Sequence, residues 1–214
     1  YFNFIKYMKR KKTKNLFKIL FVPMMFLLIM WTTHLFQFVF NISFIKLGVL
    51  PKTYIGLKGI FLSPFIHKDW SHLINNSYPI LVLGTLLFYS YKKIAYRIFF
   101  LLFIFSGVLL WMIGRQSFHI GASGIIYSLA SFLFFSGIIR KNPPLTAISL
   151  VVLFLYGSMI WGLFPINKFS SWEGHLSGFI TGLVISILFR EDGPKRKKYQ
   201  WEIDEENELL SNDV

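Results

Sequence analysis

Six long apolar runs constrain this chain more than any other feature of its sequence. Each run holds about 16–22 residues, close to the ~20 residues that a helix needs to cross ~30 Å of hydrocarbon. A water-soluble domain needs one buried core, whereas apolar residues make up 54% of this chain and recur along its length. We therefore predict an all-α membrane protein with six transmembrane helices, at 19–40, 73–91, 98–114, 120–139, 145–166 and 174–189.

Positive charge is distributed unevenly over the predicted loops. Most of the 23 Lys and Arg residues lie in the N-terminal arm, the second and fourth loops and the C-terminal tail, which a six-span arrangement places on one side. The positive-inside rule then predicts that both termini are cytoplasmic, and the same basic clusters suit anionic membrane lipids. Membrane orientation thus explains the net charge of +13, and nucleic acid is not an expected partner.

Composition divides the chain into three parts. A basic cytoplasmic arm covers 1–18, a six-helix membrane domain covers 19–190, and a charged cytoplasmic tail covers 191–214. The tail is first basic and then acidic, and we expect it to be poorly ordered. Residues 41–70 form the one long loop, which is apolar enough to lie on the membrane interface at the non-cytoplasmic side.

Polar residues inside apolar helices are costly and therefore informative. His72 and Asn76 enter the second predicted span four residues apart, so both project from one face of the helix. Ser123 begins the fourth span within Gly-Ala-Ser-Gly, and His175 lies near the start of the sixth. Because the three even-numbered spans enter the membrane from the same side, these four residues are expected at a similar depth.

These residue types suit acyl transfer. A histidine within hydrogen-bond reach can take the proton of a serine and make it a nucleophile, which predicts a catalytic Ser123–His175 dyad. The backbone N–H of Ser123, the His72 ring and the Asn76 amide are suitable donors for a tetrahedral oxyanion. Tyr127 lies one turn below the serine, on the same face of the helix.

Small residues surround the predicted dyad. Gly121 and Gly124 would let a substrate backbone come close to the serine, because no Cβ is in the way. Gly178 and Gly182 share a face with His175 and would allow a neighbouring helix to approach closely.

The acidic residues nearest to these helices are Asp69 and Glu173, both at the membrane edge, where neither is well placed to orient the imidazole. No cofactor and no metal are expected, because the chain has no cysteine and no H-E-x-x-H motif. A surface metal site at His67, Asp69 and His72 is a weak alternative. His34 and His119 are interpreted as structural.

The pieces "HLINN", "GASGIIY" and "GHLSGFITG", in this order on alternating spans, resemble the rhomboid family of intramembrane serine proteases. The resemblance covers about residues 57–190. It implies Ser123 as nucleophile and His175 as base, an oxyanion site at His72 and Asn76, and Tyr127 against the catalytic histidine. It further implies hydrolysis of peptide bonds in or near the transmembrane segments of membrane-protein substrates, from a cavity open on the non-cytoplasmic side, with non-helical backbone before Ser123.

Some features depart from the family pattern. Trp70 is followed by Ser71, where the family often has Trp-Arg in its first loop, and Pro79 is expected to kink the second span.

The alternative function is an inactive rhomboid-like protein that binds membrane clients, although such relatives generally lack the serine or the histidine. A small transporter would need acidic residues at mid-membrane, and the predicted spans hold none. The expected location is a bacterial plasma membrane.

Overall fold

The computed structural model describes residues 2–166, 170–194 and 200–212. Lys168 and the basic residues at 195–198 of the predicted tail lie outside this part of the chain. The described residues are mostly helical and form no strand; Val49 and His119 make a single isolated bridge. The long helices are α1 (Phe2–Phe40), α3 (Trp70–Ser90), α4 (Ala95–Ile113), α5 (Ser123–Ile139), α6 (Pro143–Tyr156), α7 (Trp172–Leu188) and α8 (Gln200–Asn212).

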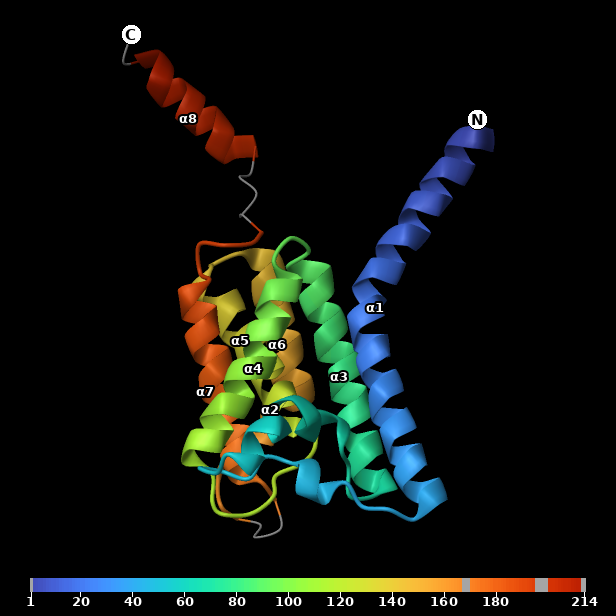
Figure 1. Cartoon of the computed structure of the whole chain (residues 1–214). Helices are drawn as coiled ribbons and strands as arrows, with labels where there is room; N and C mark the ends of the chain where they lie inside the picture. Colours follow the sequence, from blue (N-terminus) through green and yellow to red (C-terminus); the bar gives the residue numbers. More distant parts are fainter. Residues whose placement is uncertain (1, 167–169, 195–199, 213–214) are drawn as a thin grey trace.

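Each of the six apolar runs became a helix, but some bounds differ from the prediction. The predicted basic arm continues the first run as one helix, and this half of α1 extends beyond the bundle (Figure 1). The predicted span 145–166 corresponds to the helical stretch Pro143–Leu163, which is α-helical only to Tyr156 and then tightens into the 3-10 helix η4 (Gly157–Leu163). The expectation of a poorly ordered tail is wrong for Gln200–Asn212, which form α8.

Helix α5 is the centre of the bundle. It packs against α3, α4, α6 and α7, and most of its residues are buried, including Ile125, Leu129 and Phe132. Helix α1 lies on the outside against α3, as Figure 1 shows. Since α5 begins with Ser123, the predicted nucleophile is carried by the central helix of the bundle.

Three helical stretches are long and apolar enough to cross a membrane: Leu16–Phe40, Ala95–Ile113 and Pro143–Leu163. Three shorter apolar helices are Ile55–Phe65, Ser123–Ile139 and Trp172–Leu188. Helix α5 is shorter than the predicted span 120–139 because it begins only after a non-helical approach, whereas α7 begins two residues before the predicted start at 174. Large apolar side chains, such as Phe154 at 88% exposure, point outward from the bundle, as expected for a surface that faces lipid.

The segment between α1 and α3 contains short helices and supports the loop before α5. These helices are η1 (Ile45–Leu47), η2 (Ile55–Lys58), α2 (Gly59–Leu62) and η3 (Ser63–Phe65), at the end of the bundle opposite the free half of α1 (Figure 1). Val49 exchanges both backbone hydrogen bonds with His119, and the Gly121 N–H donates to the Ser63 carbonyl at 2.8 Å. The long first loop thus fixes the backbone that leads to Ser123.

Candidate active site

Ser123 is the first residue of α5 and follows a sharp, non-helical turn. Gly121 has a φ of +103°, which an L side chain rarely adopts, and a Cβ there would lie 2.6 Å from the His72 ring. A residue with a side chain could therefore neither make this turn nor let His72 approach. A Cβ at Gly124 would lie 3.4 Å from the Gly174 carbonyl oxygen on α7, an ordinary contact, and the expectation that Gly121 and Gly124 let a substrate backbone come close stays a prediction.

His175, in the first turn of α7, is held from two sides. Its ring stacks on the Tyr127 ring, with centroids 4.3 Å apart and planes 8° from parallel. Its Nδ1 lies 2.9 Å from the carbonyl oxygen of Gly162 in η4. A carbonyl oxygen only accepts hydrogen bonds, so Nδ1 carries the ring proton and the Nε2 lone pair is left to accept one.

Helix α3 brings His72 and Asn76 to the same place. Asp69 caps the helix by accepting a hydrogen bond from the His72 backbone N–H at 2.8 Å. Asn76 is buried, and its Nδ2 has no hydrogen-bond partner among the described residues. The adjacent Asn75 is exposed and donates to Ser71 at 3.4 Å. A buried amide donor without a partner is costly, which singles out Asn76, and not Asn75, as the donor kept for a ligand.

One open cavity of about 710 Å³ brings the predicted dyad and the predicted oxyanion donors together. Its lining includes Ser123, His175, His72 and Asn76. Within the described part of the chain, the Ser123 hydroxyl has no hydrogen bond to His175 or to another group. Catalytic hydrogen bonds are often long in a free enzyme and shorten when substrate binds. The two residues share a cavity, and a hydrogen bond between them can therefore form when a substrate enters it.

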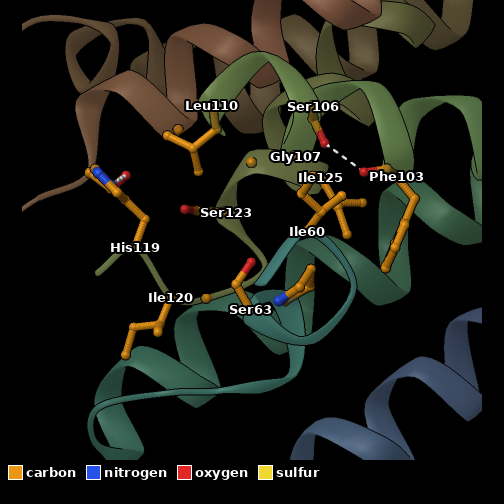
Figure 2. A pocket seen from close by; sticks show the side chains of 15 residues that line it. Ile60, Ser63, Phe103, Ser106, Gly107, Leu110, His119, Ile120, Ser123 and Ile125 are labelled. Atoms are coloured by element: carbon orange, nitrogen blue, oxygen red, sulfur yellow. Dashed lines mark hydrogen bonds between the residues drawn. The ribbon is translucent and has the colours of Figure 1, made fainter. Parts of the chain in front are cut away.

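A second, smaller cavity lies beside the nucleophile. Its volume is about 30 Å³, which is room for one or two water molecules. Figure 2 shows Ser123 at this cavity with Ser63 and His119, and with Ser106, which donates to the Phe103 carbonyl at 3.2 Å. Ser123 thus lies between the large open cavity and a small one, whose mainly apolar lining includes a few polar side chains.

Close contact between α5 and α7 sets the distance between the two predicted catalytic residues. A Cβ at Gly178 would overlap the Gly124 carbonyl, and one at Gly182 would overlap the Ser128 carbonyl. In addition, the Ser131 hydroxyl of α5 donates to the Phe179 carbonyl of α7 at 2.7 Å. Glycine at these positions lets the two backbones touch directly.

A polar cluster, which sequence reasoning missed, joins the loop before α5 to the start of α7. Arg115 pairs with the buried Glu173 at 3.6 Å and donates to the Ser170 carbonyl at 2.8 Å. His119 donates through Nε2 to the Arg115 carbonyl at 3.1 Å and accepts from the Ser171 hydroxyl through Nδ1 at 2.6 Å. Burial lowers the pKa of His119, which favours the neutral ring that this pattern needs.

His67 is buried against His72, with the ring centroids 4.9 Å apart and the rings edge to face. In the described residues, no group of three or more His, Asp or Glu side chains is placed to hold a metal ion. Both His67 ring nitrogens lack hydrogen-bond partners there. Burial, and next the nearby His72, lower the pKa of His67 to about 3.

We predict that acid destabilises the protein through His67. Between pH 6.5 and 3 the unfolded state binds a proton that the folded state excludes, so stability is lost as pH falls through this range. The loss at pH 5 is about 2 kcal/mol. Thermal unfolding in detergent at pH 7 and pH 5 measures it, and the His67→Leu variant should show a smaller drop. An equal drop in both proteins would contradict this role of His67.

Comparison with known proteins identifies the family. The model of the rhomboid domain matches residues 56–192, which include all of α3 to α7. The chain belongs to the rhomboid family. With its apolar helices, this rhomboid is an integral membrane protein.

Relatives of this rhomboid occur in bacteria, a virus and a plant. An uncharacterized protein of Mycobacterium bovis is 35% identical over 159 residues, which are 70% of this chain and 65% of that protein. A putative rhomboid protein of Acanthamoeba polyphaga mimivirus is 29% identical over 130 residues, 58% of this chain and 71% of its own. RHOMBOID-like protein 4 of Arabidopsis thaliana is 24% identical over 150 residues, 65% of this chain and 38% of its own. The match thus spans just under two thirds of the mycobacterial protein's length.

Proposed function

We propose that this rhomboid is an intramembrane serine endopeptidase that cleaves membrane-protein substrates in or near their transmembrane segments. The observation that carries the proposal is the shared cavity of Ser123 and His175, in which the Gly162 carbonyl leaves His175 Nε2 free to accept a proton. Membership of the family supports it.

The chemistry follows from the positions of these groups. Ser123 Oγ attacks the carbonyl carbon of the scissile bond while its proton passes to His175 Nε2. The oxyanion accepts hydrogen bonds from the Ser123 N–H, which has no partner within the first turn of a helix, from Asn76 Nδ2 and from the His72 ring. The C–N bond then breaks and His175 gives its proton to the leaving amine, which leaves an acyl-enzyme on Ser123. Water, deprotonated by His175, hydrolyses the ester and regenerates the serine.

The arrangement in the membrane is part of the proposal. Six spans are formed by α1, α3, α4, α5, α6 with η4, and α7, with both termini on the cytoplasmic side because the basic residues gather there. The cavity then opens on the non-cytoplasmic side. The membrane is a bacterial plasma membrane, whose anionic lipids suit the basic clusters of the sequence.

Cleavage of a reporter tests the function. The purified chain is reconstituted in liposomes with a single-span reporter protein, and mass spectrometry locates the new termini. We expect cleavage in or next to the transmembrane segment. A reporter that is captured by the protein but stays intact would instead favour the alternative, an inactive rhomboid-like protein that binds membrane clients.

The buried amide of Asn76 gives a second prediction. Asn76→Ala should lower kcat on the order of 10²- to 10³-fold, because one oxyanion donor is lost. Asn75→Ala is the matched control, since this exposed neighbour should change kcat by no more than about two-fold. Steady-state cleavage of the same reporter measures both, and equal effects of the two substitutions would contradict the assignment of Asn76.

A further inference from the structure

The base of a serine protease needs a third group to hold its ring, and a carboxylate is the usual choice. Neither of the two acidic residues near the site orients the His175 ring. Asp69 caps α3 through the His72 N–H, and Glu173 pairs with Arg115 on the far side of the first turn of α7. The imidazole of His175 must therefore be oriented by something else.

We infer that the backbone carbonyl of Gly162, at the end of the 3-10 helix η4, is the positioning group that fixes the tautomer and orientation of His175. This inference rests on the proposed function and names a further part of the same site. The carbonyl accepts from Nδ1 at 2.9 Å, and Tyr127 prevents the ring from tilting away by stacking on its face. Which ring nitrogen of a neutral histidine holds the proton is set by the bond that the other nitrogen makes.

Helix η4 is anchored at a second point. Its Met159 carbonyl accepts a hydrogen bond from the Tyr127 hydroxyl at 2.7 Å. Two carbonyls of η4 thus hold the two stacked rings, one carbonyl for each ring. The chain changes from α-helix to 3-10 helix at Gly157, and both carbonyls belong to this 3-10 segment.

Position 162 also has the residue type that this contact needs. A Cβ there would overlap the Tyr127 hydroxyl oxygen and would lie 3.1 Å from His175 Nδ1. Gly157, at the start of η4, has no such constraint, because its Cβ would lie 3.4 Å from a Leu153 methyl group, an ordinary contact. The two glycines of one short helix therefore form a matched pair for an experiment.

The tautomer can be read directly. Purified wild-type chain in detergent, labelled with ¹⁵N-histidine, is studied by long-range ¹H–¹⁵N correlation at about pH 8, where ordinary histidines are neutral. Signals of His175 are assigned by their loss in His175→Ala. We expect the proton on Nδ1 in the wild type and in Gly157→Ala, and a mixture of both tautomers in Gly162→Ala.

Kinetics provides the second readout. Gly162→Ala should lower kcat on the order of 10²-fold with little change in KM, because a misplaced base affects the chemical step. Gly157→Ala should keep the wild-type kcat. A wild-type His175 protonated on Nε2 would overturn the inference, as would a Gly162→Ala variant with wild-type kcat, or one that loses activity with its tautomer unchanged.

The inference and the proposed function can fail separately. If the wild type cleaves no reporter, the function fails, yet the wild-type spectrum, assigned with His175→Ala, still decides the tautomer without any substrate. If the wild type cleaves through Ser123 while His175 carries its proton on Nε2, the function stands and the role of Gly162 is lost.

Discussion

Ser123→Ala and His175→Ala should each lower the rate of reporter cleavage on the order of 10⁶-fold, to background. The double variant should be no worse than either single variant, because the two side chains act as one unit. Alanine at 123 removes the oxygen that attacks, and alanine at 175 removes the group that takes its proton. Rates are measured with reconstituted protein of equal folded content.

Ser128→Ala is the control for this series. Ser128 lies on the same helix as Ser123, is fully buried, and donates only to the Ile125 carbonyl of its own helix at 2.8 Å. Its loss should leave the cleavage rate within about two-fold of the wild type. If Ser123→Ala retained wild-type activity while Ser128→Ala lost it, the nucleophile would be assigned wrongly.

Gly178→Ala should have the second largest effect, on stability and activity together. The new Cβ would overlap the Gly124 carbonyl, which is backbone and cannot rotate away, so α5 and α7 must separate. Overpacking of this kind costs about 1–3 kcal/mol, or roughly 3–10 °C in Tm for a chain of this size. Separation of Ser123 from His175 by about 1 Å lowers kcat on the order of 10²-fold.

Thermal unfolding in detergent and reporter cleavage test Gly178 together. Gly157→Ala is again the matched glycine substitution, because its Cβ meets only a side-chain methyl group at ordinary contact distance. A Gly178→Ala variant with the wild-type Tm and kcat would show that the α5–α7 contact does not set the geometry of the site.

The all-helical class and the approximate positions of the long helices could be predicted from the sequence, because hydrophobic length is a local property. The end of the fifth apolar run could not. Residues 157–163 continue the apolar run, and the change to 3-10 geometry is accompanied by contacts with Tyr127 and His175 from other helices. Tertiary contacts of this kind leave no periodic signal in the chain.

The candidate site shows the same division. Ser123, His72, Asn76 and His175 could be found because their side chains are polar in apolar surroundings. The Gly162 carbonyl could not, since a backbone group has no residue-type signature beyond the small size of its own residue. The close approach of the His72 ring to Gly121 could not be predicted for a related reason, since the two residues lie far apart in the sequence.

The most direct test of the central claim is covalent labelling of the nucleophile. A fluorophosphonate reacts with a serine only where a base activates it, and mass spectrometry of the purified wild-type chain identifies the labelled residue. The account predicts a single phosphonate on Ser123, absent from His175→Ala and retained in Ser128→Ala. A folded wild-type protein that carries no label on Ser123, or carries it on another serine, would contradict the account.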